Sequence, residues 1–329
     1  LTKGYIREID GLRGLAVVLV VFYHFFPEKL TGGFVGVDLF FVISGFLITN
    51  IIVNELKSGT FSLYDFYVRR VQRLFPALVF TIFITAAFGW YVLYTDEFKM
   101  LGWHIKSSSI FVLNHSYINE FGYFDKASIE KPLLHLWSLS VEGQFYILWS
   151  LFILGIFFTK LNQQISISIV LLVSFIFCVW LTYRNDTYAF FFTGARVWEF
   201  ALGSVVFLNS HKKISTRSSN IMSIVGISLI VISALFFHKG MLFPGFFALF
   251  PVVGAALVIL SGNKSYINRS IVSNNVMVGI GLISYPAYLL HWPVVSYLNI
   301  LSGSNVSIID KVIAISVVVI CSILVYFFI

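Results

Sequence analysis

The sequence predicts an all-α fold, a polytopic membrane helix bundle of about ten transmembrane helices with one further interfacial or re-entrant helix. The 329 residues are 58% hydrophobic and only 11% charged, which is more apolar surface than a soluble core of this size can bury. Apolar runs recur along the chain at close to the roughly 20 residues that a helix needs to cross a bilayer. Lys and Arg gather in alternate loops, as the positive-inside rule expects.

The apolar runs set the expected spans, with ends defined to within about three residues. The aromatic share of 18% and the seven tryptophans suit the two membrane–water interfaces. The first run has no small-residue cleavage site and a second run follows directly, so we predict a retained span rather than a signal peptide. The expected spans are 12–26, 34–53, 74–94, 137–157, 165–183, 189–208, 221–237, 242–260, 276–299 and 312–329.

The segment from Leu101 to Ile118 is too polar for a helix that faces lipid. It contains Lys106, Ser107 and Asn114, each of which is costly to bury in hydrocarbon. We therefore predict an interfacial or re-entrant helix here, with both ends on the same side of the membrane.

Loop charges predict that the N-terminus is inside. With this orientation the inner loops hold most of the basic residues, including Arg69, Arg70 and Lys212, and few acids. A full crossing at 101–118 would reverse all later loops and weaken this bias. The orientation therefore also favours the re-entrant interpretation of that segment.

The chain is expected to form one integral-membrane domain over 1–329, because it shows no internal repeat and no low-complexity linker. It stops at Ile329 within an apolar run, which suggests a chain truncated before a further span and a further domain. Cys178 and Cys321 lie in apolar runs and predict neither a disulfide framework nor a metal site. The net charge of +7 follows from the loop bias and needs no nucleic acid to explain it.

Arg13 and His24 are two ionisable residues in the first apolar helix. They are eleven residues apart, which returns them to nearly the same helix face about 16 Å apart along the axis. A charge inside a span costs roughly 3 kcal/mol or more, so such residues usually have a function. The structural alternative is a snorkelling Arg with a His that is hydrogen-bonded to a neighbouring helix.

A basic cluster of Arg69, Arg70 and Arg73 begins the third span on the inner side. Their i,i+3 and i,i+4 spacing places all three on one broad helix face. Guanidinium forks suit phosphate, so we expect a phosphorylated soluble ligand, although lipid headgroups would satisfy the same residues.

Two acids are candidates for catalysis near the outer face. Glu142 lies two turns past His135, close to the same helix face, and the two form a candidate acid/base pair. Asp38 follows a glycine-rich loop between the first two spans and is expected close to His24, whose ring it could orient. Each could instead be an ordinary residue at a helix start that faces water or binds a neighbour.

Three further residues lie inside later spans. Arg196 and Glu199 are one turn apart, and a structural ion pair is the favoured interpretation because pairing makes buried charges tolerable. His291 could donate a hydrogen bond across the bundle, in either a structural or a functional role.

Together these motifs resemble the acyltransferase-3 family of membrane O-acyltransferases. They occur in order over nearly the whole chain, as Arg13-x10-His24, Gly33-Phe-Val-Gly-Val-Asp38-Leu-Phe-Phe-Val-Ile-Ser44, Arg69-Arg70-x2-Arg73-Leu-x-Pro76, Leu136-Trp-Ser-Leu-Ser-Val-Glu142 and Tyr288-x2-His291-Trp-Pro. One segment departs from the pattern: similar proteins have Glu-Glu-Gln-Phe where this chain has Glu142-Gly-Gln-Phe. No role therefore passes to a second glutamate.

The resemblance implies transfer of an acyl group, most often acetyl, from cytoplasmic acyl-CoA to a hydroxyl of a cell-surface glycan such as lipopolysaccharide O-antigen. It implies a multi-pass protein of the bacterial inner membrane with a cytoplasmic N-terminus. Acetyl-CoA would be the donor substrate, and no metal is expected. The expected partners are acyl-CoA, a glycan or lipid-linked glycan acceptor and membrane lipid, with no nucleic acid. Some members carry an extracytoplasmic SGNH hydrolase-like domain after the last spans.

This function assigns the candidate residues two roles. Arg69, Arg70 and Arg73 would hold the CoA phosphates, with Arg13 beside the donor path. His24 would be the base or a transient acyl carrier. The predicted catalytic set is His24, Asp38, Glu142 and His135. The acyl group would cross on the flexible pantetheine arm or as an acyl-enzyme.

Two other functions are considered. A proton-coupled secondary transporter could use the same buried charges, but transporters often show inverted repeats, which are not visible here. A non-catalytic membrane scaffold would not need titratable residues that face the bundle interior.

Overall fold

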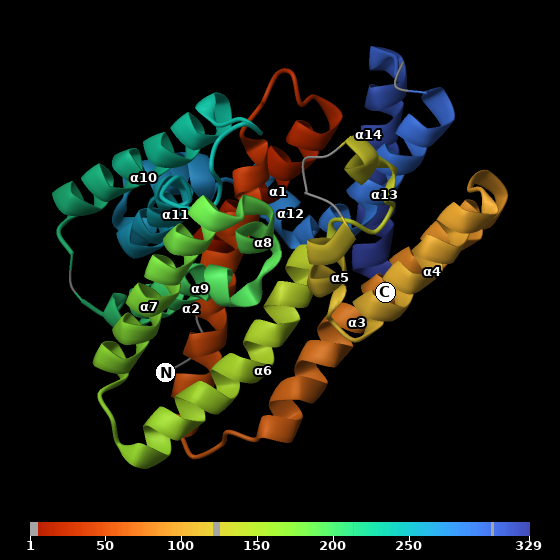
Figure 1. Cartoon of the computed structure of the whole chain (residues 1–329). Helices are drawn as coiled ribbons and strands as arrows, with labels where there is room; N and C mark the ends of the chain where they lie inside the picture. The colour runs from red at the N-terminus through yellow and green to blue at the C-terminus, as the bar shows by residue number, and fades with distance from the viewer. Residues whose placement is uncertain (1–5, 121–125, 213, 304–305) are drawn as a thin grey trace.

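The computed structural model describes residues 6–120, 126–212, 214–303 and 306–329, and within these ranges every regular element is helical. Figure 1 shows the helices as one bundle. The α-helices are α1 (Arg7–Phe25), α2 (Gly36–Lys57), α3 (Leu63–Val92), α4 (Thr95–Ser109), α5 (Leu113–Glu120), α6 (Leu136–Thr159), α7 (Gln163–Arg184), α8 (Asp186–Phe191), α9 (Thr193–Asn209), α10 (Thr216–Phe236), α11 (Leu249–Ser261), α12 (Asn275–Leu282), α13 (Ser284–Ser302) and α14 (Ile308–Phe328). Short 3₁₀ or π turns lie at Gly33–Val35, Lys126–Glu130, Gly262–Lys264 and Asn268–Val272.

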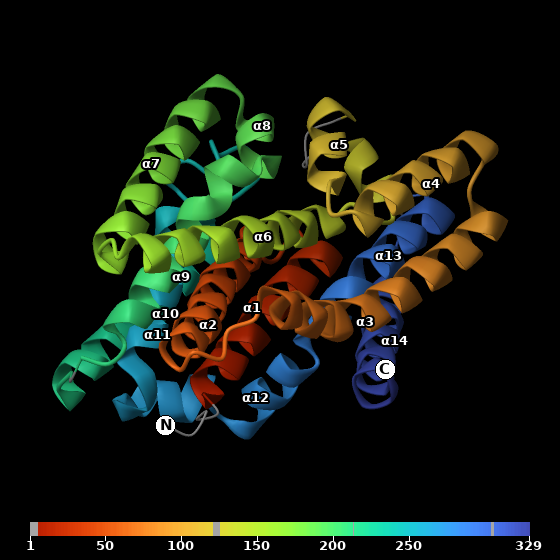
Figure 2. The same ribbon diagram turned by 90° about the horizontal axis from the view of Figure 1, so that it is seen from below.

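The first two helices form the centre of the bundle. Figure 2 shows α1 and α2 between α6 on one side and α12 on the other. α2 packs against α9, which packs against α7, while α10 pairs with α11 and α13 with α14. The residues that sequence analysis singled out therefore come from helices that meet around α1 and α2.

The predicted count of ten spans is not confirmed. Within the described ranges, six helices are long and apolar enough to cross a membrane, and the bent pair α12 and α13 would make a seventh. Three expected spans correspond to helices that fall short of this criterion. α1 carries several charged residues in its first two turns, α9 has only 17 residues, and α11 has only 13. The six helices are Gly33–Lys57, Leu63–Val92, Leu136–Thr159, Gln163–Arg184, Thr216–Phe236 and Ile308–Phe328.

Two expected spans are interrupted. The span expected at 276–299 bends by 66° between α12 and α13, so α13 begins at Ser284 in a new direction. The span expected at 242–260 has its helix only from Leu249 onwards. Hydropathy alone does not register such breaks, because the residues on both sides of each break are apolar.

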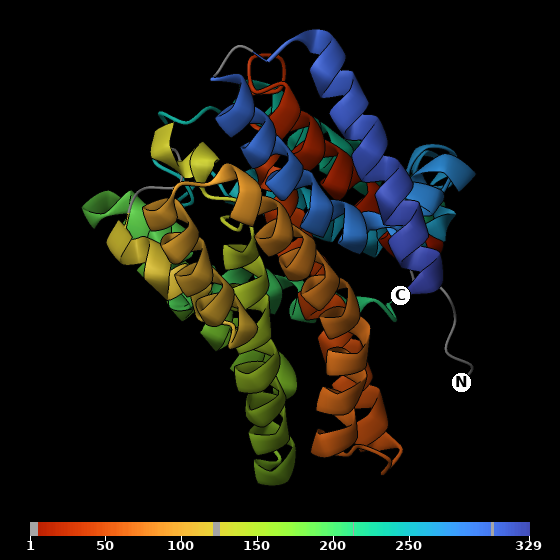
Figure 3. The same ribbon diagram turned by 90° about the vertical axis from the view of Figure 1, so that its right-hand side faces the viewer.

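The polar segment 101–118 folds back on itself, as the re-entrant interpretation expects. α4 returns from the end of α3, the chain reverses at Phe111, and α5 runs back beside α4 (Figure 3). His104 Nε2 lies 3.1 Å from both carboxylate oxygens of Glu120, and Ser116 donates to Ser107 over 3.1 Å. Neither α4 nor α5 meets the length and apolarity criterion for a span.

Small residues bring α2 and α9 unusually close. A Cβ added at Gly45 would lie 1.9 Å from the carbonyl oxygen of Phe200, and one at Gly203 would lie 2.0 Å from that of Val42. Thr49 Oγ1 donates to Ser204 Oγ across the same crossing over 2.7 Å. Close backbone approach with hydroxyl hydrogen bonds is typical of helix association in membranes. This crossing fixes the position of Ser44 and its neighbours on α2.

Candidate active site

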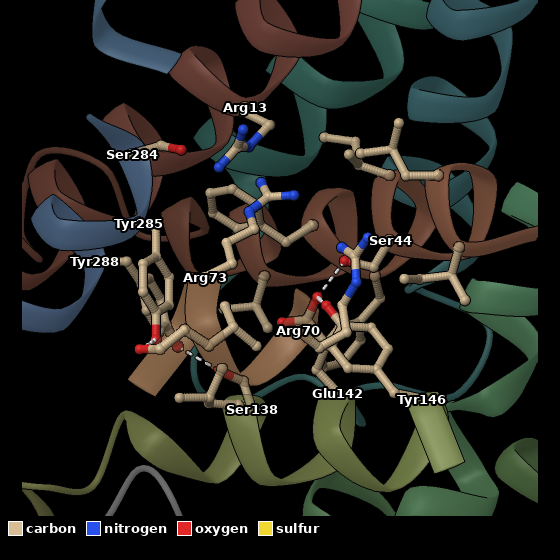
Figure 4. Close-up of a pocket in the computed structure, with 18 residues that line it drawn as sticks. Arg13, Ser44, Arg70, Arg73, Ser138, Glu142, Tyr146, Ser284, Tyr285 and Tyr288 are labelled. Carbon is tan, nitrogen blue, oxygen red and sulfur yellow. Dashed lines mark hydrogen bonds between the residues drawn. The ribbon is translucent and has the colours of Figure 1, made fainter. Parts of the chain in front are cut away.

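A cavity of about 90 Å³ lies between α1, α2, α3, α6 and α13, and we call it the arginine cavity. Figure 4 shows the side chains of Arg13, Arg70 and Arg73 gathered around it, with Glu142 and Tyr146 from α6 and Tyr285 and Tyr288 from α13. Its polar lining residues are Arg13, Ser44, Arg70, Arg73, Ser138, Glu142, Tyr146, Ser284, Tyr285 and Tyr288.

The charge in this cavity is unbalanced. Three guanidinium groups line it, but Glu142 is the one carboxylate among its lining residues. Arg13 is paired with Asp10 at 3.2 Å, whereas neither Arg70 nor Arg73 forms an ion pair in the described part of the chain. Gathered cations without matching acids favour an anionic ligand.

Glu142 is held by two hydroxyl groups. Ser44 from α2 and Tyr146 from the next turn of α6 both donate to its Oε1. These two hydrogen bonds fix the position of the Glu142 side chain in the arginine cavity. Glu142 therefore lies with the arginines rather than near His24.

Arg69 does not line the arginine cavity. Its guanidinium makes two hydrogen bonds to the Glu55 carboxylate, at 3.0 and 2.8 Å, and the side chain is 44% exposed. Contrary to expectation, Arg69 therefore does not share one ligand site with Arg70 and Arg73. Consecutive helix residues point about 100° apart, and Glu55 at the end of α2 binds Arg69 outside the cavity.

A hydrogen-bonded pair of histidines lies at the other end of α1. His24 Nδ1 is 3.0 Å from His291 Nε2, and His291 Nδ1 is 2.6 Å from the carbonyl oxygen of Tyr288. Because a carbonyl only accepts, His291 Nδ1 carries the proton and, in the neutral ring, His291 Nε2 accepts. We therefore assign the Nδ1–H donor to His24, which leaves the lone pair of the neutral ring on His24 Nε2.

Tyr288 connects this histidine pair to the arginine cavity. Its ring lines that cavity, and its hydroxyl is 2.6 Å from Ser138 Oγ and donates to the carbonyl oxygen of His135 over 3.0 Å. The buried His135 ring lies 5.5 Å from Tyr288 and 5.7 Å from His291. Tyr288 thus lines the arginine cavity together with Arg13 and Glu142, and its main-chain carbonyl accepts from His291, the partner of His24. We call this series of polar groups between the two ends the polar line.

His24 itself lines a second cavity of about 210 Å³, which we call the His24 cavity. Trp292 stands edge-on against the His24 ring at 4.5 Å. Arg13 and His24 therefore lie at opposite ends of one continuous helix and face different cavities. The remaining residues of the His24 cavity are Phe25, Pro27, Ile129, Val295, Leu298, Asn299, Val306 and Lys311.

Asp38 does not orient His24 as expected. It lies in a buried ion cluster, with Arg196 Nη2 2.5 Å from its Oδ1 and Glu199 Oε1 3.0 Å from Arg196 Nη1. The rings of Phe41 and Phe243 lie within 5.7 Å of the guanidinium carbon. The expected Arg196–Glu199 pair is present. The crossing of α2 and α9 adds Asp38 to this pair, and the pairing makes the three buried charges tolerable.

The expected pairing of His135 with Glu142 is also absent. His135 packs beside Tyr288 and His291, whereas Glu142 binds Ser44 and Tyr146. Two helical turns separate the two residues by about 10 Å, which is too far for proton exchange without an intermediary. In the described part of the chain, no group of three or more His, Cys, Asp or Glu side chains is arranged to hold a metal ion.

Sequence reasoning gave no role to several residues of these sites. Ser44, Tyr146 and Tyr285 line the arginine cavity, and Tyr288 joins it to the histidines. The i,i+3 spacing of Tyr288 and His291 was the available signal, since it places both on one face of α13.

The helices enclose a cationic cavity at one end of the polar line and an imidazole-lined cavity at the other, an arrangement that suits a membrane-embedded enzyme. Comparison with known families agrees, because a family model described as "Acyltransferase domain" matches residues 6–327. The chain belongs to the acyltransferase-3 family, and it is an O-acyltransferase. This assignment decides against the secondary transporter and the scaffold.

Curated relatives agree with this assignment. A protein named "Putative membrane-bound transacylase BcsY" from Komagataeibacter xylinus is 31% identical over 300 residues, which cover 90% of this chain and 74% of that protein. The peptidoglycan O-acetyltransferase OatA of Listeria monocytogenes is 31% identical over 320 residues, covering 90% of this chain and 50% of OatA. A protein named as a putative O-acetyltransferase from Staphylococcus aureus strain COL is 32% identical over 313 residues, covering 90% and 51%.

The chain therefore spans about half the length of the O-acetyltransferase relatives. No solved structure matches it.

Proposed function

We propose that the chain transfers an acetyl group from cytoplasmic acetyl-CoA to a hydroxyl of a cell-surface glycan, across a bacterial inner membrane and with its N-terminus in the cytoplasm. The single observation that carries this proposal is the polar line between two cavities, with Arg13 and Arg73 at one end and His24 at the other. Donor and acceptor would approach from opposite sides. Peptidoglycan, named in the OatA relative, and O-antigen are the acceptor classes to test first.

The donor would bind at the arginine cavity. Its volume of about 90 Å³ admits a narrow chain but not a nucleotide, since drug-sized ligands fill pockets of roughly 300 Å³ or more. The acyl-bearing end of the pantetheine arm would therefore enter the cavity while the phosphates stay at its mouth, against Arg70 and the exposed Arg73. The acyl group then has to pass the hydrogen-bonded Ser138 and Tyr288 to reach His24.

The acceptor hydroxyl would bind in the His24 cavity. His24 Nε2 takes the hydroxyl proton as the oxygen bonds to the thioester carbonyl carbon. The carbon–sulfur bond breaks, and CoA leaves as a thiolate that takes a proton from the imidazolium or from water. His291 holds His24 in the tautomer that this step needs, as a positioning residue.

His291 provides a test of the tautomer assignment. Replacing it with leucine removes the acceptor for His24 Nδ1–H, and we expect kcat to fall roughly ten- to a hundredfold while the KM for acetyl-CoA stays unchanged. His291→Gln can place a carbonyl oxygen near the lost acceptor and should recover part of kcat. The measurement is steady-state acetyl transfer by each variant over a range of pH, because loss of the His24 partner also shifts the pH profile. Equal losses in the leucine and glutamine variants would contradict the assignment.

The proposed function itself is tested with the purified chain in lipid vesicles. Radiolabelled acetyl-CoA is supplied on the side of the arginine cavity, and O-antigen or a peptidoglycan fragment on the side of His24. Label should appear on the glycan as a base-labile ester, and only when both substrates are present. Label that stays on CoA with every glycan would contradict the proposed function.

A further inference from the structure

An apolar groove of about 360 Å³ runs between α3 and α13, outside the two cavities described above. No charged side chain lines it in the described part of the chain, and the hydroxyl of Tyr297 donates to the carbonyl oxygen of Thr85. The side chains at its edges are open to the surroundings, with Phe88 46% and Leu301 62% exposed. The lining residues are Ile84, Thr85, Phe88, Pro293, Val294, Tyr297, Leu298 and Leu301.

This groove adjoins the His24 cavity. Leu298 lines both, and Val294 in the groove precedes Val295 in the cavity on α13. The groove occupies the C-terminal parts of α3 and α13, the same end of the bundle as His24. A hydrocarbon chain lying in it would therefore place its head group beside His24.

A cationic side chain lines the cavity in which that head group would lie. Lys311, in the first turn of α14, lines the His24 cavity, and its Nζ is 3.9 Å from a carboxylate oxygen of Glu28. Glu28 is 56% exposed, and a long, exposed ion pair of this kind contributes little free energy. Lys311 can therefore exchange this partner for a phosphate at low cost.

From this combination of adjoining surfaces we propose that the acceptor is a lipid-linked saccharide. Its hydrocarbon chain lies in the α3–α13 groove, its phosphate contacts Lys311, and its sugar hydroxyl reaches His24 Nε2. An apolar groove, a cation and a base thus lie next to one another, as the places for the tail, phosphate and sugar of such a molecule should. This inference rests on the proposed function and specifies its acceptor.

The first test compares two acceptors, a polyisoprenyl diphosphate carrying one N-acetylglucosamine and N-acetylglucosamine diphosphate without the chain. The unmodified protein should show at least a tenfold lower KM for the chain-bearing acceptor. Val294→Trp fills the groove and should remove this advantage without changing transfer to the chainless acceptor. Val79→Trp, at an exposed position of α3 outside the groove, is the matched control and should behave like the unmodified protein. Equal KM values for the two acceptors in the unmodified protein would overturn the inference while leaving the proposed function intact.

A binding test is independent of transfer. A photoreactive polyisoprenyl diphosphate N-acetylglucosamine should label peptides from 84–88 or 293–301, and Ile84→Trp or Val294→Trp should abolish the labelling. Lys311→Gln should weaken it, whereas Lys311→Arg should restore it. Excess phosphatidylglycerol should not compete, and if it does, the groove holds bulk lipid and the inference is wrong. Labelling without transfer to any acceptor would contradict the proposed function instead.

Discussion

Replacing His24 with alanine is expected to lower acetyl transfer to the acceptor by about a hundred- to ten-thousandfold, the usual worth of a general base. In the proposed mechanism, His24 Nε2 carries the lone pair that takes the hydroxyl proton. Affinity for acetyl-CoA should not change, because the ring lines the His24 cavity and not the arginine cavity. The measurement is the rate of ester formation, with acetyl-CoA binding determined separately on the same preparation.

A matched control exists for this substitution. His115 lies exposed on α5 and lines neither cavity, so His115→Ala should retain the full rate. Full transfer by His24→Ala, with its fold verified, would remove His24 from the mechanism.

Replacing both Arg70 and Arg73 with glutamine is expected to raise the KM for acetyl-CoA by roughly tenfold or more for each arginine, since a hydrogen bond to a charged group contributes about 1.5–3 kcal/mol. The KM for the acceptor should not change, because the acceptor binds at the other end of the polar line. Saturation curves for each substrate in turn measure both quantities.

The neighbouring arginines make this test specific. Arg69→Gln should have a smaller effect because Glu55 already binds that guanidinium outside the cavity. Arg217→Gln, an exposed change on α10, should have none. If the double variant keeps the KM of the unmodified protein, phosphate binding by Arg70 and Arg73 is excluded.

Local sequence rules predicted features confined to a single helix. The spacing of Arg13 and His24 placed them at two ends of one helix, and α1 is continuous over both. The i,i+3 spacing of Arg196 and Glu199 likewise predicted their ion pair. The polarity of 101–118 indicated a segment that folds back.

Contacts between helices could not be predicted in this way. Asp38 was expected beside His24, but the α2–α9 crossing, which depends on Gly45 and Gly203, gives it to Arg196. Glu142 was expected to pair with His135, but Ser44 and Tyr146 hold it with the arginines. Periodicity determines which face of a helix a residue occupies and not which helix lies opposite.

The length of apolar runs also limited the prediction of spans. The bend between α12 and α13 and the late start of α11 at Leu249 lie within apolar sequence. Hydropathy therefore merged helical and non-helical residues into spans of uniform length. The polar line depends on the direction that α13 takes after its bend, because α13 carries both Tyr288 and His291.

The most direct test is a density map of the purified chain with a non-hydrolysable acetyl-CoA analogue. We predict nucleotide density against Arg70 and Arg73, with the acyl end inside the arginine cavity and directed toward Tyr288. Nucleotide density beside His24 and Lys311, with the arginine cavity unchanged, would contradict the separation of donor and acceptor on which the mechanism depends.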